Sequence, residues 1–279
     1  MMAGATFTKH ADGGADLPAE AAALAWLGEA RAQGGMPVAE VMGVDAHTLV
    51  ERRVQTAQPT ADAAERIGRA LAHTHAAGAA WFGAPPSGMA GDAYVISYSR
   101  TPVVHEAQAK AEPDTVATWG AFFWHHRILG YVRTLVDEGT IGTSERLLFE
   151  RLGARLLAGD FDAAQPALVG EKGHAVARIH GDLWAGNVLF DADPANEVGG
   201  TLIDPMAHGG HAETDLAMLA LFGLPYLPRT LAAYNEVSPL ADGWTERVAL
   251  HQLAPLLHHC VLFGGGYVAQ TLEAAHRYV

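Results

Sequence analysis

The sequence has one cysteine and no long apolar run, and each absence argues against a class of protein. With Cys260 alone the chain cannot form an internal disulfide, which favours a reducing compartment. No stretch of about 18 consecutive apolar residues occurs, so we expect no membrane-spanning helix. The first residues, MMAGATFTKHADGG, lack the apolar core of a secretory signal. We therefore expect a cytoplasmic protein with no membrane partner.

Basic residues are also scarce. Lys and Arg together number 18 against 31 Asp and Glu, which gives a formal net charge of -13. A nucleic-acid surface needs clustered Lys and Arg to neutralise phosphates, so we expect no nucleic-acid partner. At 279 residues, the chain is long enough for one large domain or two lobes with substantial cores. Nothing in the composition indicates an oligomeric state.

The first 55 residues predict a small lobe of mixed α and β structure. ATFTKH alternates like a short strand and carries Lys9. LPAEAAALAWLGEARAQGG predicts a helix, with Asp16 as its N-cap and Gly34 after its end. Glu20 falls on the apolar face of this helix, where a carboxylate needs a partner. VAEVMGV and HTLVERRV predict two further strands.

Residues 56–279 predict a larger, mainly helical lobe, joined to the first by a hinge near residues 51–58. The segments with helical periodicity are TADAAERIGRALAHTHAAG, EPDTVATWGAFFWHHRILGYVRTLVDEG, SERLLFERLGARLLAG, ETDLAMLALFG, LPRTLAAYNEV, WTERVALHQLAPLLHHCVLF and GYVAQTLEAAHRY. The stretch from WFGAPPSGMAGDAYVISYSR onward is rich in Gly, Pro and Ser and predicts a long loop. The fold class is therefore α+β with two lobes.

Residues 177–205 combine short apolar segments with a dense polar motif. ARIH and NVLF predict two strands around the loop GDLWAG, which has Asp182 at its start and Asn187 just after its end. VGGTLID predicts a third strand that presents Asp204 just before Pro205. Because these side chains lie at the ends of adjacent predicted strands, we expect their oxygen atoms to converge.

Convergent carboxylate and amide oxygens suit a metal-assisted phosphoryl transfer. Mg²⁺ prefers such oxygen ligands and keeps water and phosphate oxygens in its coordination shell. In kinases one Asp orients the acceptor hydroxyl, while a following Asn and a downstream Asp hold the metal. An Asp or Asn in a glycine-containing loop is more often a simple turn residue. The joint pattern, in the second half of a two-lobed chain, favours the kinase interpretation.

Several blocks resemble the fructosamine kinase (ketosamine-3-kinase) family, a branch of the aminoglycoside-phosphotransferase group with the protein-kinase fold. They are IHGDLWAGNVLFD, LIDPMAHGGHAETDLAMLALFG, RVALHQLAPLLHHCVLFGGGYV, TWGAFFWHHRIL and IGRALAHTHAAGAAWFG. The Trp in DLW favours this family over related phosphotransferases with DLH. The resemblance implies a protein-kinase-like two-lobed fold and ATP-dependent phosphorylation of the sugar 3-hydroxyl of a ketosamine. That reaction destabilises the adduct and releases the amine from a free ketosamine or from a glycated protein lysine.

The resemblance also implies roles for residues of the polar motif. Asp182 matches the catalytic base, and Asn187 and Asp204 match the Mg²⁺ ligands. Trp184 matches the position on which the sugar is expected to stack.

For ATP, the resemblance implies a site built from the first lobe. Lys9 matches the strand lysine that reaches the phosphates, and Glu20 matches the helix glutamate that pairs with it. Glu51 and Arg53 match the hinge, whose main chain contacts adenine, so their side chains are not expected to matter.

The sequence departs from the family pattern before Lys9. The family has two strands and a glycine-containing phosphate loop there, whereas MMAGATF is too short for them and ADGGAD follows Lys9. Amides of that loop normally help to bind the phosphates. The alternatives are a recorded start that is too late, a natural short form that still binds ATP, or a non-catalytic nucleotide or ketosamine binder. A phosphotransferase for another small molecule, such as an aminoglycoside or a choline-like alcohol, is a further alternative.

Overall fold

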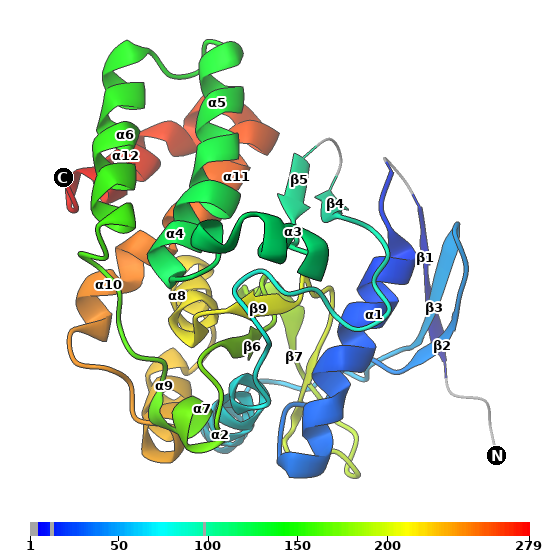
Figure 1. The fold of residues 1–279 in the computed structure, drawn as a ribbon. Coiled ribbons are helices and arrows are strands. Elements are labelled where there is room, and N and C mark those ends of the chain that lie inside the picture. The colour runs from blue at the N-terminus through cyan, green and yellow to red at the C-terminus, as the bar shows by residue number, and fades with distance from the viewer. Residues whose placement is uncertain (1–4, 12–13, 97–98) are drawn as a thin grey trace.

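The structure is a computed structural model that describes residues 5–11, 14–96 and 99–279. The expected absence of a phosphate loop concerns segments that lie partly outside these residues, at 1–4 and 12–13. Figure 1 shows a small sheet and one helix on one side of the molecule and most of the helices on the other. No helix of the described residues is long and apolar enough to cross a membrane.

The N-terminal part is an antiparallel sheet against one helix. In sheet order its strands are β1 (Thr6–His10), β3 (Thr48–Arg52) and β2 (Val41–Val44). Helix α1 (Leu17–Gly28) starts after Asp16, whose carboxylate accepts the N–H of Ala19 at 3.0 Å. A 3-10 turn extends it to Gly34, which adopts φ 89°. The predicted strands, helix and caps of this part are confirmed.

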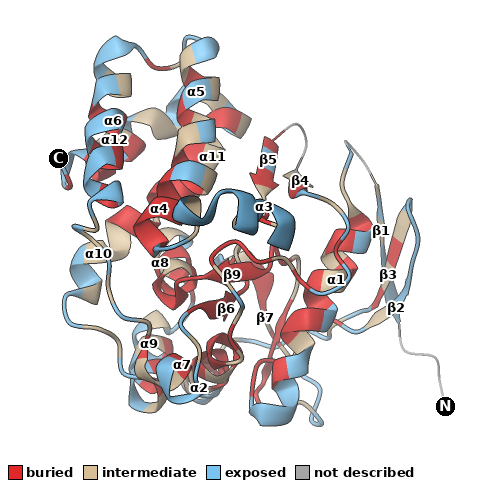
Figure 2. Ribbon diagram, in the orientation of Figure 1, coloured by how far each residue is buried: buried red, intermediate tan, exposed pale blue. Residues whose placement is uncertain are grey.

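The rest of the chain is mainly helical. Its helices are α2 (Ala61–Ala76), α3 (Glu106–Ala111), α4 (Trp119–Phe123), α5 (Leu129–Asp137), α6 (Thr143–Leu157), α7 (Ala167–Glu171), α8 (Ala212–Phe222), α9 (Leu227–Val237), α10 (Trp244–His251), α11 (Leu253–Phe263) and α12 (Val268–His276). The largest apolar core lies among α4, α5, α6 and α11, with Phe123, Phe149 and Leu257 fully enclosed. Figure 2 shows buried residues concentrated in this part and few in β1 and β2. The division into lobes at residues 1–55 and 56–279 stays a prediction.

The long helix predicted to start at Pro113 is interrupted. Thr118 caps a new helix, α4, because its hydroxyl accepts the N–H of Ala121 at 3.2 Å. α4 then runs through a π-helical turn, Trp124–Ile128, into α5. The apolar periodicity on both sides of Thr118 concealed this cap.

The stretch predicted as a long loop contains a hairpin, β4 (Ala93–Ile96) and β5 (Ser99–Pro102). Tyr94 is buried in it, and its hydroxyl donates to the carbonyl oxygen of Ala207 at 2.7 Å. The hairpin is thereby tied to the segment that follows Asp204. The Gly- and Pro-rich flanks explain why its short strands gave no clear signal.

The strands around the polar motif pair differently from the prediction. β6 (Ala177–Ile179) pairs with β9 (His208–Gly210), and β7 (Val188–Phe190) pairs with β8 (Gly200–Leu202). The expectation that all three motif strands are neighbours is therefore wrong, because β6 and β7 belong to separate two-stranded sheets. The sequence HGG of β9 has low strand propensity, so this partner was not predicted.

Candidate active site

The polar motif forms the loop between β6 and β7, and two glycines allow its shape. Gly181 adopts φ 82°, a left-handed conformation that favours glycine. A Cβ atom at Gly181 would lie 2.2 Å from the carbonyl oxygen of Met206. A Cβ atom at Gly186 would lie 2.2 Å from the ring of Trp184. Gly181 therefore lets the chain pass close to Met206, and Gly186 leaves room for the Trp184 ring.

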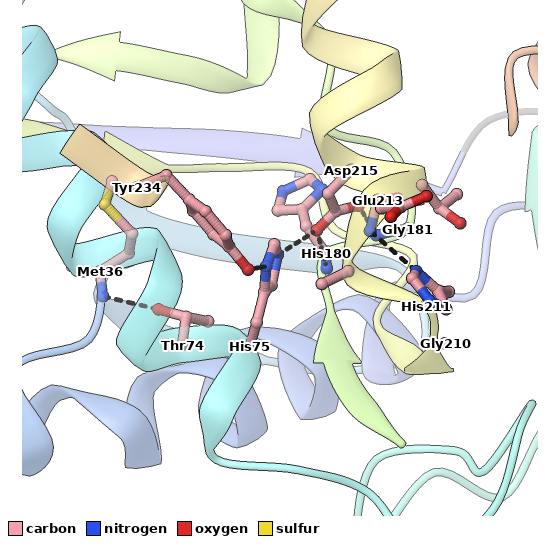
Figure 3. Close-up of polar contacts among 12 residues, drawn as sticks. Met36, Thr74, His75, His180, Gly181, Gly210, His211, Glu213, Asp215 and Tyr234 are labelled. Carbon is pink, nitrogen blue, oxygen red and sulfur yellow. Dashed lines mark hydrogen bonds and ion pairs between the residues drawn. The ribbon is translucent and has the colours of Figure 1, made fainter. Parts of the chain in front are cut away.

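A buried polar network fixes the backbone of this loop (Figure 3). Asp215 of α8 accepts the N–H of His180 at 2.7 Å and that of Gly181 at 3.0 Å. His75 of α2 lies 3.1 Å from Asp215 Oδ2 and 2.9 Å from the hydroxyl of Tyr234. Burial alone would raise the pKa of the Asp215 carboxyl, but these partners outweigh it and the pKa lies below its usual value. Asp215 thus holds the loop from beneath.

His180 braces the loop from inside. Its Nε2–H donates to the carbonyl oxygen of Ile203 at 2.9 Å, and its Nδ1 accepts the N–H of Asp182 at 3.2 Å. These two contacts require a neutral ring, and burial lowers the pKa of His180 accordingly. The ring therefore connects Asp182 to the chain immediately before Asp204.

Asp182 is held by Asn187 across the loop. The Nδ2 group of Asn187 donates to Asp182 Oδ2 at 3.0 Å and to its main-chain oxygen at 2.8 Å. Burial raises the pKa of the Asp182 carboxyl to about 7, although the hydrogen bond from Asn187 opposes the rise. A pKa near neutrality suits a group that exchanges a proton with a substrate. Because Nδ2 is directed at Asp182, the amide oxygen Oδ1 of Asn187 points away from it.

Lys9 lies among three carboxylates. Its ammonium group hydrogen-bonds to Glu20 of α1 and to Asp204, and it lies 3.7 Å from Oε2 of Glu51. Burial disfavours the cation, but Glu20 and Asp204 outweigh this and raise the pKa of Lys9. The carboxylate on the apolar side of α1 thus has a cationic partner in β1.

Glu51 lies on β3 and Arg53 follows just after it. The Glu51 side chain is only 5% exposed and lies beside Lys9, while the contact of its main chain with adenine stays a prediction. Strand register explains this orientation, because Leu49 pairs with Lys9 and Glu51 lies two residues further along the same face. Burial raises the pKa of the Glu51 carboxyl, while Lys9 opposes the rise. The N–H of Arg53 donates to the carbonyl oxygen of Ala5 at 2.9 Å, so in this state it is already engaged.

Asp204 presents hard oxygen atoms beside Asn187. It adopts φ 55°, a left-handed conformation that Asp tolerates better than most residues. Its side chain is 45% exposed. A carboxylate and an amide oxygen form a donor set that fits Mg²⁺, which uses few protein ligands. Asp204 and Asn187 are therefore the residues that could hold such an ion.

Six of the eight residues singled out from the sequence line one cavity of 490 Å³, namely Lys9, Glu20, Asp182, Trp184, Asn187 and Asp204. Glu51 is not among the lining residues, and Arg53 lines a different cavity of 570 Å³. Tyr94 also lines the 490 Å³ cavity, and the sequence gave no signal for it. Trp184 is 41% exposed, which leaves part of its ring accessible.

Residues 9–279 match the family model described as fructosamine kinase. The chain belongs to the fructosamine kinase family. A probable ketoamine kinase of Synechocystis is 33% identical over 166 residues, which cover 56% of this chain and 47% of that protein. One of Enterococcus faecium is 30% identical over 153 residues, 55% of this chain and 50% of that protein. The chain spans about half the length of these relatives.

Solved structures of the family have the same fold. A structure from Thermobifida fusca, assigned as a fructosamine-3-kinase, is 41% identical with a TM-score of 0.79, covering 98% of this chain and 85% of that one. A macrolide 2′-phosphotransferase type I shares the fold at 17% identity and a TM-score of 0.51, covering 94% and 78%. The expected family and the protein-kinase-like α+β fold class are confirmed.

Proposed function

We propose that this chain is an ATP-dependent kinase that phosphorylates a sugar hydroxyl of ketosamines, with the 3-hydroxyl as acceptor. The observation that carries the proposal is the convergence of Lys9, Asp182, Asn187 and Asp204 on one cavity. Lys9 and Asp204 are 195 positions apart in the sequence and yet hydrogen-bond to each other. Membership of the fructosamine kinase family supplies the substrate class.

Asp182 orients the acceptor hydroxyl and takes its proton. Asn187 fixes the Asp182 carboxylate by donating to Oδ2, and Asp215 fixes the loop backbone through two N–H groups. Asp204 and Asn187 would hold Mg²⁺, which when bound would supply positive charge near the transferring phosphoryl group. Positioning and electrostatics account for most of the acceleration in this class of reaction.

Lys9 binds the phosphates of ATP while Glu20 fixes its direction. An incoming phosphate offers the ammonium group a new anionic partner, so the contact with Asp204 is exchanged when nucleotide binds. The cleft between residues 1–55 and 56–279 takes the nucleotide, with adenine against the main chain that follows β3. The Glu51 side chain, buried beside Lys9, adds negative charge to that side of the cleft.

Trp184 stacks on the sugar of the acceptor. The residue is 41% exposed and borders the same cavity as Asp182, which brings an apolar side chain close to the proposed base. Free ketosamines and glycated protein lysines both carry such a sugar.

A coupled assay of ADP release with Mg²⁺ and a panel of free ketosamines tests the proposal. We expect turnover that depends on the ketosamine and is lost in Asp182→Asn. The control Asp137→Asn makes the same chemical change at an exposed residue at the end of α5. An aminoglycoside and choline are tested beside the ketosamines. Faster turnover of either one would show that ketosamines are not the substrate class. Absence of turnover together with absence of Mg·ATP binding would reject a kinase in favour of a ketosamine binder.

A further inference from the structure

A second, smaller cavity adjoins the proposed base. It has a volume of 60 Å³ and shares Asp182 and Met206 with the larger cavity. Aromatic side chains such as Trp119 and Phe122 form much of its wall. A space of this size holds about two water molecules, which is too little for a sugar ring. Only a small group attached to the sugar can enter it when a sugar hydroxyl lies at Asp182.

Arg127 lines this second cavity and forms no ion pair with an acidic side chain of the described residues. The residue is 7% exposed, and its Nη1 group donates to the carbonyl oxygens of Pro102 and His126 at 2.7 and 2.9 Å. Its Nη2 group is buried without a hydrogen-bond partner among the described residues. The guanidinium carbon lies 4.6 Å from the ring centre of Phe122. These contacts leave the Nη2 group without an acceptor and the positive charge without a counter-ion among the described residues.

Another arginine that is buried in this protein, Arg178, has an acidic partner. Arg178 also packs on an aromatic ring, that of Trp26, but its Nη1 group lies 2.8 Å from a carboxylate oxygen of Glu29. In Arg127, burial lowers the pKa of the guanidinium to about 10, and no carboxylate of the described chain opposes this. A buried charge without a counter-charge is strongly disfavoured, so an anion supplied from outside would be favoured there.

The other polar groups of the second cavity limit the kind of anion. Burial lowers the pKa of His208 to about 3 and those of His211 and His258 to about 4, so these rings are neutral. Nε2 of His258 is a second buried nitrogen without a described partner. Arg127 is the one cationic side chain of this lining and Asp182, the proposed base, the one acidic side chain, so the guanidinium matches a single negative charge. A phosphate dianion would leave part of its charge uncompensated.

Arg127 is also positioned by an unusual backbone. It lies in the π-helical turn Trp124–Ile128 between α4 and α5. Such turns are rare, and they often occur at functional sites because the extra residue redirects the side chains. This supports a ligand-binding role over simple helix packing.

We propose that Arg127 binds a carboxylate attached next to the glycated nitrogen, so that the kinase selects ketosamines formed from the α-amine of a free amino acid. This inference rests on the proposed function and names its substrate class. In such an adduct the carboxylate is one carbon away from the nitrogen, a group small enough for the second cavity. A glycated lysine within a protein has no carboxylate at that place.

The test compares fructosylglycine with fructosylglycinamide, which replaces the carboxylate by a neutral group of the same shape. Loss of a charge-assisted hydrogen bond predicts that kcat/KM of the wild-type protein is about tenfold to hundredfold lower for the amide. In Arg127→Met the ratio of kcat/KM for the two substrates should fall close to one, whatever the absolute activity of the variant. Combining both substrates with both proteins cancels intrinsic differences between the substrates.

The outcomes separate this inference from the proposed function. Equal kcat/KM for the two compounds in the wild-type protein would overturn the role of Arg127 and leave the kinase intact. A kcat/KM for an Nε-fructosyllysine peptide equal to that for fructosylglycine would also overturn it. A higher kcat/KM for a 6-phosphorylated ketosamine would show that Arg127 binds a phosphate and not a carboxylate. No turnover with any ketosamine would overturn both proposals. If Arg127→Met does not fold, the wild-type comparison still decides, and Arg127→Lys keeps the charge.

Discussion

The two sides of the candidate site are built in opposite ways. On the helical side, the loop between β6 and β7 is anchored by Asp215 and His180, which are 1% and 0% exposed. On the sheet side, Lys9 lies on β1, a strand that is otherwise exposed and that pairs only with β3 among the described strands. The proposed chemical groups are therefore held rigidly, whereas the proposed phosphate-binding lysine depends on its ionic partners for its position.

The largest effect is expected at the proposed base. Asp182→Asn should lower kcat by about 10² to 10⁴, the usual contribution of a general base. Its thermal midpoint should not fall, because the substitution removes a charge that burial disfavours. Steady-state kinetics and calorimetry on the same preparation measure both. A variant within twofold of wild-type kcat would show that the helical side does not supply the base.

The anchor beneath the loop should affect both activity and stability. Asp215→Asn keeps the shape but places an NH₂ group against one of the N–H donors of His180 and Gly181. We expect a loss of about 2 to 4 kcal/mol in the free energy of unfolding, since a buried charged acceptor is removed. Urea unfolding measures it, with Asp137→Asn expected within about 0.5 kcal/mol of wild type. An equally small change for Asp215→Asn would remove the contrast between the two sides.

On the sheet side, we expect a large effect on nucleotide binding and a smaller effect on stability. Lys9→Met should weaken Mg·ATP binding by about tenfold or more, since it removes the charge-assisted contact with the phosphates. The free energy of unfolding should also fall, because Glu20, Glu51 and Asp204 lose their cation, but by less than in Asp215→Asn, since Lys9 is partly exposed. Titration calorimetry measures the binding, and Lys172→Met, at an exposed lysine, is the matched control. Unchanged nucleotide affinity would exclude Lys9 from the site.

The smallest effect concerns acid stability on the helical side. Burial would raise the pKa of Glu213, but hydrogen bonds from Arg247 and His251 outweigh it and lower the pKa from 4.5 to about 2. The folded state thus keeps this carboxyl ionised at a lower pH than the unfolded chain does. Its stabilisation is present above pH 4.5 and is lost as the pH falls toward 2. Thermal midpoints should fall less steeply with acid in Glu213→Gln, and parallel slopes would refute this.

Local signals in the sequence predicted what depends on local chemistry. The Asp16 cap, the end of the first helical segment at Gly34 and the HGDLWAGN motif follow from residue type and spacing. The pairing of β6 with β9 does not, because it depends on contacts between segments that are distant in sequence and have little strand propensity.

The same limit applies to individual site residues. Glu51 was expected to act through its main chain, and only the register of β3 against β1 reveals that its side chain faces Lys9. Arg127 lies in a segment that reads as ordinary amphipathic helix, and its lack of an acidic partner becomes visible only when the surrounding chain is in place. Tyr94 lies in a stretch whose composition suggested a loop.

The position of Lys9 has a consequence for the protein before nucleotide binds. Glu20, Glu51 and Asp204 come from three separate segments, and their like charges would repel one another in a cleft without a cation. Lys9 acts as a resident counter-ion that keeps these segments together. The ammonium group that we propose to bind phosphate thus also holds three carboxylates together, and phosphate binding would have to replace part of these contacts.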